Sequence, residues 1–172
     1  MANVAFIVDE MFEDSEFKIP FERVPEAGHD ATVVGIEANK TIEGKKGKET
    51  VTTQIAIDDV NASGFDAVVI PGGYSPDHLR ANEKMVQLVK QVYEAGKPVA
   101  AVCHGPWMLV EADILRGKTV TSWPSIKTDV RNAGAEWVDQ EVVEDGNIIT
   151  SRKPDDLEAF SKAVLSQIEQ TT

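Results

Sequence analysis

Cysteine is the residue that this chain has least of, with one thiol, Cys103, in 172 residues. A single cysteine excludes an intrachain disulfide and is typical of a protein of the reducing cytoplasm, where we expect this one to work. Long apolar runs are also missing, since no stretch approaches the roughly 18 apolar residues of a membrane span. The amino terminus enters an apolar segment at Val4 with no basic region before it, so we expect neither a signal peptide nor a membrane partner.

Positive charge is scarce as well. The chain has 17 Lys and Arg residues against 29 Asp and Glu residues, a formal net charge of −12. Phosphate backbones bind basic surfaces, so this balance argues against nucleic acid as the main partner. One local basic cluster is formed by Lys40, Lys45, Lys46 and Lys48. Because lysines are usually exposed, we interpret this cluster as a solvated turn.

The elements of a metal or cofactor site are few. Three histidines, His29, His78 and His104, accompany the one cysteine, and none of them pair at the usual ligand spacing. No glycine-rich dinucleotide fingerprint follows the first apolar run, where such enzymes carry it. The sequence therefore predicts no metal and no cofactor.

The chain is long enough for one domain over residues 1–172, with 42% apolar residues. Continuous apolar runs at 4–8, 31–36, 65–70 and 98–102 are typical of strands buried on both faces. Helical segments separate them, and the lysine-rich stretch 41–57 has the alternation of a hairpin at the sheet edge. This pattern predicts an α/β sandwich: a mostly parallel sheet with helices on both faces.

Three unusual segments follow three of these strands directly, at 10–14, 71–74 and 103–106. Ligands of parallel sheets bind at the carboxyl ends of the strands. We therefore expect one edge of the sheet to carry a carboxylate, a Gly-Gly backbone, and a thiol beside an imidazole.

Cys103 lies where an apolar strand ends, before Gly105, Pro106 and a helix. This order predicts a nucleophile elbow, a sharp turn that holds the nucleophile at the sheet edge. A helix N-terminus next to the thiol would favour the thiolate. Most lone cysteines are inert and buried, but the strand–Cys–His–Gly–Pro context favours a reactive nucleophile.

The neighbouring residues suggest roles around that nucleophile. Cys103 would attack a carbonyl carbon, and backbone N–H groups of Gly72, Gly73 and His104 could bind the oxyanion. Glu13 is the candidate carboxyl beside the thiol, as proton shuttle or donor. Each role has a purely structural alternative. The two glycines can serve only to form a tight turn, and Glu13 can be a carboxylate that the helix dipole favours in the first turn of a helix. The predicted pocket lining, for which packing is the alternative, is Tyr74, His78 and Trp123.

Four motifs together resemble the ThiJ/PfpI superfamily, in its PfpI-type intracellular protease and bacterial stress-protein branch. They are Val-Cys-His-Gly-Pro at 102–106, Pro-Gly-Gly at 71–73, Phe-Glu-Asp at 12–14 and Thr-Ser-Arg-x-Pro-Asp-Asp-Leu at 150–157. The resemblance extends over nearly the whole chain, and the combination is far more specific than any single motif.

The resemblance implies a flavodoxin-like three-layer sandwich, also called a glutamine amidotransferase-like domain. It implies that Cys103 is the nucleophile on its elbow, that Glu13 hydrogen-bonds the thiol, and that His104 is its neighbour. An acidic residue from an adjacent subunit orients that histidine in PfpI-type members. Asp77 occupies this position, where the archetype has Glu, and its shorter side chain puts an intersubunit triad in doubt. The resemblance also implies homodimers, which in some members assemble into hexamers.

The activity implied by the resemblance has several forms. One is cofactor-free conversion of methylglyoxal to lactate, or deglycation of early adducts, as stress protection; its substrate is a small aldehyde or a glycated compound. A second is an intracellular cysteine peptidase. A third is a redox or stress sensor without turnover, in which Cys103 is oxidised to sulfenic or sulfinic acid.

Overall fold

A computed structural model describes residues 1–171. Its main sheet has seven strands in the order β10-β11-β7-β6-β1-β2-β5. All neighbouring pairs are parallel except the hairpin of β10 and β11. The strands are β1 (Asn3–Ile7), β2 (Asp30–Gly35), β5 (Ile55–Ala56), β6 (Ala67–Ile70), β7 (Val99–Val102), β10 (Val143–Asp145) and β11 (Ile148–Ser151). The predicted, mostly parallel sheet is confirmed.

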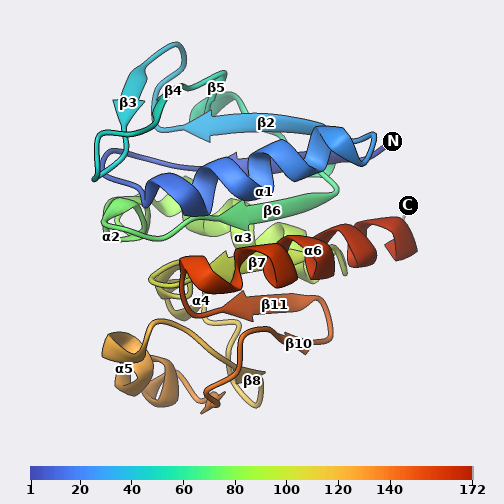
Figure 1. Ribbon diagram of the computed structural model, residues 1–172. Helices are drawn as coiled ribbons and strands as arrows, with labels where there is room; N and C mark the ends of the chain where they lie inside the picture. The colour runs from blue at the N-terminus through green and yellow to red at the C-terminus, as the bar shows by residue number, and fades with distance from the viewer. Residues whose placement is uncertain (172) are drawn as a thin grey trace.

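Helices cover both faces of this sheet. α1 and α6 lie on one face, and α3 and α4 lie on the other (Figure 1). The α-helices are α1 (Asp14–Glu26), α2 (Ser75–Leu79), α3 (Glu83–Glu94), α4 (Trp107–Glu111), α5 (Lys127–Asn132) and α6 (Leu157–Thr171). None of the helices in residues 1–171 combines the length and the apolar character that crossing a bilayer requires.

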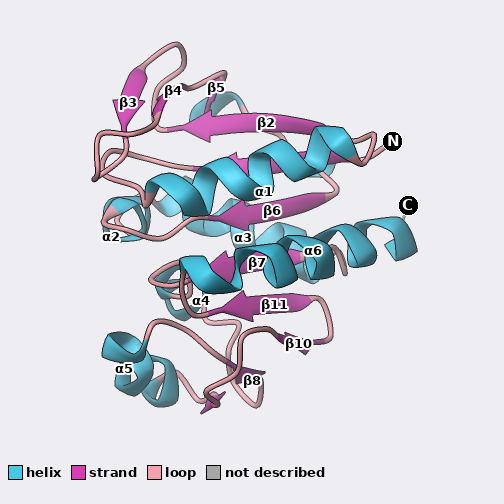
Figure 2. Ribbon diagram, viewed as in Figure 1, coloured by secondary structure: helices cyan, strands magenta, loops and turns pink. Residues whose placement is uncertain are grey.

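Smaller elements complete the chain. β3 (Thr41–Glu43) and β4 (Thr50–Thr52) form an antiparallel hairpin beside the main sheet (Figure 2), and β8 (Thr119–Val120) pairs with β9 (Glu136–Trp137). Short 3-10 turns are η1 (Ile57–Asp59), η2 (Ala62–Gly64), η3 (Pro124–Ile126) and η4 (Pro154–Asp156). The hairpin predicted within 41–57 is therefore present.

The continuous apolar runs have a direct structural cause. Successive side chains of a strand point to opposite faces of the sheet. Val4 and Phe6 of β1 pack with α1 and α6, whereas Ala5 and Ile7 pack in the cluster that contains α3 and α4. Both faces are covered, so neither set of side chains can be polar.

Helix α1 contains Pro20 and Pro25, each of which removes a backbone donor. Its aromatic face offsets that loss. The rings of Phe17 and Phe21 lie 5.8 and 5.2 Å from the ring of Phe6 in β1. Contact with the sheet therefore fixes a helix that its own hydrogen bonds would hold only weakly.

The strand order places the site. β1 has β2 on one side and β6 on the other, so the sheet reverses its winding direction there. Ligands bind at such reversal points, beyond the carboxyl ends of the strands. The arrowheads of β6 and β7 point to the end of the sheet where α2 and α4 lie (Figure 1). At that end the N–H of Glu13 donates to the carbonyl of Gly72 at 3.1 Å, which joins the segments after β1 and β6.

The loop of the β3–β4 hairpin is fastened to this end by Asp14, the first residue of α1. Its carboxylate accepts backbone N–H bonds from Lys46 at 2.9 Å, Lys48 at 2.9 Å and Glu49 at 2.8 Å. Burial alone would raise the pKa of Asp14, but these N–H donors outweigh it and hold the pKa below its ordinary value. The hairpin loop is therefore held in one position beside the start of α1.

We expect Asp14→Asn to lower the free energy of unfolding by about 1–3 kcal/mol at pH 7, because buried N–H groups lose a charged acceptor. The loss should shrink as the pH falls below about 3.8, because unfolded wild type then takes up a proton at Asp14 before the folded chain, with its lowered pKa, does. Urea unfolding measures both effects. Asp155→Asn is the control, because Asp155 also lies in the first turn of a helical segment but is exposed. Equal effects of the two substitutions would contradict the role of Asp14.

Candidate active site

The site is built around a strained turn at Cys103. The backbone φ of Cys103 is +64°, in the left-handed region that few non-glycine residues adopt. The turn is held on both sides, since its N–H donates to Ser151 at 3.0 Å and its carbonyl accepts from Trp123 at 2.9 Å. A Cβ at Gly105 would come within 2.5 Å of the Ile70 carbonyl, so only glycine fits after the turn. The elbow geometry expected at this position is thus present in the backbone.

The carboxyl group beside the thiol belongs to Glu16. Its side chain is fully buried, and its Oε1 accepts the Gly72 N–H at 2.9 Å. A Cβ on Gly72 would collide with both Glu16 Oε1 and Cys103 Cβ, so the two side chains meet over that glycine. The other oxygen, Oε2, lacks a hydrogen-bond partner within residues 1–171. The Glu16 carboxyl group interacts with the Cys103 thiol.

The structure therefore differs from the prediction that Glu13 lies against the thiol. Glu13 is the N-cap residue of α1, and its carboxylate pairs with Lys45 Nζ at 3.1 Å and Lys46 Nζ at 3.2 Å. Glu16 lies three residues further on, on the face that packs against the sheet. The signal was in the sequence: Glu16 shares that face with the apolar Phe17, Pro20 and Val24.

The pair of Glu16 and Cys103 is too buried to hold two negative charges. Burial and the charge of Glu13 raise the pKa of Glu16 to about 8. Burial and the charge of Glu16 raise the pKa of Cys103, against the opposing effect of the His104 N–H. The structure therefore does not favour the expected thiolate in the resting chain, because burial and the charge of Glu16 outweigh the His104 N–H.

His104 is placed to receive the thiol proton. Its Nδ1 lies 3.4 Å from Cys103 Sγ, and its Nε2 lies 3.4 Å from Ser125 Oγ. Burial and the nearby charge of Lys45 lower the pKa of His104, so the imidazole is neutral at pH 7 and can act as a base. The resting site thus combines a neutral thiol, a neutral imidazole and a mostly protonated Glu16.

Asp77 does not approach His104 within one chain. It is exposed on α2, and Ser125 is the residue at the imidazole Nε2. An approach of Asp77 across a subunit interface therefore stays a prediction.

The three predicted oxyanion donors differ in how their backbone N–H groups are used. The N–H of Gly72 is used by Glu16, so it is not free for an oxyanion. The N–H of His104 interacts with the Cys103 thiol, and Gly73 lies in the wall of the adjacent cavity. Of the three expected donors, Gly73 is thus the one that lines the cavity and whose N–H is not already engaged by Glu16 or Cys103.

A cavity of about 160 Å³ is lined by Lys45, Gly73, Tyr74, His104 and Trp107. His104 connects this cavity to the buried thiol, since its Nδ1 lies 3.4 Å from Cys103 Sγ. Tyr74, one of the predicted lining residues, is in its wall. The other two are not: His78 Nδ1 lies 3.8 Å from Asp9, and Trp123 is bound through its backbone to Cys103. Sequence reasoning missed Lys45 and Trp107, because only the fold brings the hairpin loop and α4 to this place.

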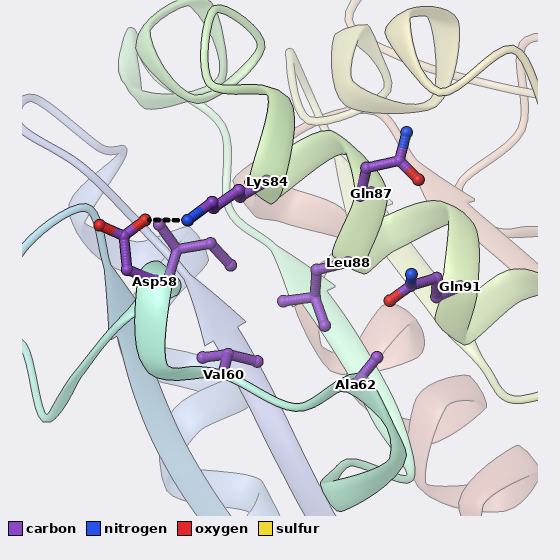
Figure 3. Close-up of a pocket in the computed structure, with 8 residues that line it drawn as sticks. Asp58, Val60, Ala62, Lys84, Gln87, Leu88 and Gln91 are labelled. Carbon is purple, nitrogen blue, oxygen red and sulfur yellow. Dashed lines mark ion pairs between the residues drawn. The ribbon is translucent and has the colours of Figure 1, made fainter.

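A second hollow lies on the α3 face, away from the thiol (Figure 3). Its volume is about 250 Å³, and it is lined by residues of α3 and of the segment 57–62. Lys84 and Asp58 form an ion pair across it at 3.0 Å. Its lining carries no cysteine or histidine, so the smaller cavity beside Cys103 is the candidate active site.

Comparisons with known proteins agree with this fold. The model of the DJ-1/PfpI family matches residues 2–167. Protein/nucleic acid deglycase 2 of Escherichia coli (strain K12) is 45% identical over 163 residues, which cover 94% of this chain and 95% of that protein. General stress protein 18 of Bacillus subtilis (strain 168) is 46% identical over 168 residues, which cover 97% and 98%. A crystal structure from Anabaena variabilis, a two-domain protein with DJ-1/ThiJ/PfpI-like and ferritin-like domains, superposes with a TM-score of 0.96 at 44% identity. The match covers 98% of this chain and 48% of that one.

The raised pKa of Glu16 predicts a pH-dependent stability. Between about pH 4.5 and 8 the folded chain keeps the Glu16 proton and the unfolded chain has lost it, so wild-type stability falls as the pH rises. Glu16→Gln removes this effect. We expect the free energy of unfolding of Glu16→Gln, measured relative to that of wild type, to increase by about 1 kcal/mol for each pH unit of rise within that window.

Urea unfolding between pH 4.5 and 8 measures this difference. Glu22→Gln is the matched control, because Glu22 is exposed on the same helix, and its stability should stay parallel to that of wild type. A parallel curve for Glu16→Gln would show that Glu16 ionises as freely in the folded chain as in the unfolded one.

Proposed function

The chain belongs to the DJ-1/PfpI family, and from that premise we propose that it is a cofactor-independent, cysteine-dependent enzyme acting on small reactive carbonyl compounds. The substrates are free 2-oxoaldehydes, as in a glyoxalase, or their early adducts with amines and thiols, as in a deglycase. Two relatives, named a protein/nucleic acid deglycase and a general stress protein, support this class of activity and a part in stress protection.

One observation carries the proposal. Cys103 stands on a left-handed turn between a neutral base, His104, and a buried acid, Glu16, beside a cavity of about 160 Å³. At about 30 Å³ for each water molecule, this space holds about five waters. It suits a compound of a few heavy atoms better than a folded protein segment.

The first step is addition of the thiol to the aldehyde carbon. His104 Nδ1, 3.4 Å from Sγ, takes the thiol proton as the S–C bond forms. The aldehyde oxygen takes this proton from His104, so the imidazole is neutral again and the product is a hemithioacetal. Glu16 is neutral at this stage, so no second negative charge opposes the sulfur as its proton leaves.

The second step moves a proton between the two carbons of the hemithioacetal. His104, neutral again, removes the proton from the carbon bound to sulfur and returns it to the neighbouring carbon, which yields a 2-hydroxyacyl thioester. Water then hydrolyses the thioester and restores the thiol. With methylglyoxal the sum is methylglyoxal plus water giving lactate, and with an adduct the amine or thiol is released as well.

The two other activities use the same thiol differently. A peptidase must also protonate an amide leaving group and seat a peptide, for which the cavity offers little space. A sensor needs only oxidation of Cys103. Both are distinguished from the proposal by turnover.

Other aspects of the prediction accompany this function. We expect homodimers, which can assemble into hexamers, with Asp77 of one subunit reaching His104 of another. We also expect a cytoplasmic protein with one domain over residues 1–172.

We expect wild type to convert methylglyoxal to lactate without any added cofactor, and Cys103→Ser to reduce kcat/KM on the order of 10³-fold or more. His104→Asn should also reduce it strongly, because the thiol loses its base. His29→Asn is the control, since His29 bonds the backbone N–H of Ala2 remote from the site. Lactate is measured enzymatically, with a fluorogenic peptide assayed in parallel.

Absence of Cys103-dependent lactate and of amine release from a methylglyoxal adduct would overturn the carbonyl activity. Cleavage of the peptide that depends on Cys103 would then favour the peptidase, and oxidation of the thiol without any turnover would favour the sensor.

A further inference from the structure

Lys45 projects the positive charge of the hairpin loop into the active-site cavity. The loop was expected to be a solvated turn, yet Lys45 lines the cavity together with His104 and Trp107. Its backbone is fixed, since the Lys45 N–H donates to the Phe12 carbonyl at 2.9 Å. The next residue, Lys46, is fixed by Asp14 at 2.9 Å. The ammonium group of Lys45 is therefore held in place by the fold.

The charged groups around this position are arranged so that ammonium groups face the cavity side of Glu13. Glu13 is a buried carboxylate that faces two ammonium groups, those of Lys45 at 3.1 Å and Lys46 at 3.2 Å. The other carboxyl group nearby, Glu16, is mostly protonated at pH 7. The mouth of the site thus presents two ammonium groups beside Glu13, while the carboxylate of Asp14 is engaged by backbone N–H groups of the same loop.

The ammonium group of Lys45 has more N–H donors than its pair with Glu13 requires. An ammonium group has three N–H donors, and Glu13 is the carboxylate that pairs with this one. The Lys45 side chain is about one-third exposed, so the remaining donors are open to the cavity and to solvent. An anionic group of a bound molecule can take them without breaking the pair with Glu13.

We propose that Lys45 is a substrate-binding residue that selects carbonyl compounds carrying a carboxylate a few bonds from the reacting carbon. The substrate class rests on the proposed function, because the carboxylate is useful only if a carbonyl group reacts at Cys103. The aldehyde carbon adds to Cys103, and the carboxylate binds the ammonium of Lys45 across the cavity. Gly73, Tyr74 and Trp107 complete the walls around the carbon chain.

The first test needs no turnover. Iodoacetate and iodoacetamide have nearly the same size and react with the same thiol, but only iodoacetate carries a carboxylate. Because Cys103 is the one cysteine, intact mass reports its alkylation without ambiguity. The quantity measured is the ratio of the iodoacetate rate to the iodoacetamide rate, in which any change in the ionisation of the thiol cancels.

We expect Lys45→Met to lower this ratio by about tenfold, because the anion loses its partner in a site of reduced dielectric constant. Lys46→Met is the matched control. It removes the same charge from the same Glu13, but Lys46 is about half exposed and does not line the cavity. Its ratio should stay within about twofold of wild type, and Lys45→Arg should restore most of the loss.

An unchanged ratio in Lys45→Met would overturn the proposal. Equal losses in the two lysine variants would overturn it as well, because a general field and not a specific contact would then attract the anion. Thermal unfolding of each variant establishes that the chains compared are folded.

The second test uses turnover. The 2-oxoaldehyde 4,5-dioxopentanoate, which gives 2-hydroxyglutarate on hydration and rearrangement, is compared with methylglyoxal. Lys45→Met should raise the ratio of the KM for the carboxylate compound to the KM for methylglyoxal by about tenfold, a ratio in which effects on His104 common to both substrates cancel. If wild type converts neither compound, the proposed function fails, while the alkylation ratio still decides the role of Lys45. If both KM values rise equally, the selection of a carboxylate fails and the carbonyl activity stands.

Discussion

Burial of the Glu16 carboxyl against the Cys103 thiol is the interaction on which the site depends. Burial raises the pKa of both groups, and the charge of Glu16, once it is ionised, raises the pKa of Cys103 further. Both groups therefore keep their protons at pH 7, and the resting site is neutral. It also makes His104, whose pKa is lowered, the group able to accept the thiol proton when a substrate arrives.

Several local features exist to keep these groups together. Gly72 is required because any side chain there would displace Glu16 or Cys103, and Gly105 because the chain passes the Ile70 carbonyl closely. The left-handed turn at Cys103 is held by Ser151 from β11 and by Trp123. Strain at such a turn persists only where the surroundings fix it. Here the fixing groups come from the ends of neighbouring strands and from the loop after β8.

The sequence was a good guide to whatever depends on local pattern. The apolar runs at 4–8, 65–70 and 98–102 predicted buried parallel strands, and the strand–Cys–His–Gly–Pro order predicted the elbow. It was a poorer guide to direction. Glu13 and Glu16 differ by less than one helical turn, and only the packing of α1 on the sheet decides which of them faces the thiol.

Contacts between distant segments were beyond local reasoning. Lys45 reaches the cavity because Asp14 fastens the hairpin loop. The sequence around either residue does not indicate this contact. Asp77 depends on a second subunit, so one chain cannot place it against His104. The site therefore follows from the fold, with the sequence motifs marking where it forms.

The pH dependence of Cys103 alkylation by iodoacetamide, in wild type and Glu16→Gln, tests the coupling most directly. At pH 6 Glu16 is protonated, so the two chains should react at similar rates. Above about pH 8 Glu16 ionises in wild type and holds back the thiol, so Glu16→Gln should react on the order of ten times faster at pH 9.5. A ratio of the two rates that stays constant from pH 6 to 9.5 would contradict the account, because ionisation of Glu16 would then have no effect on the Cys103 thiol.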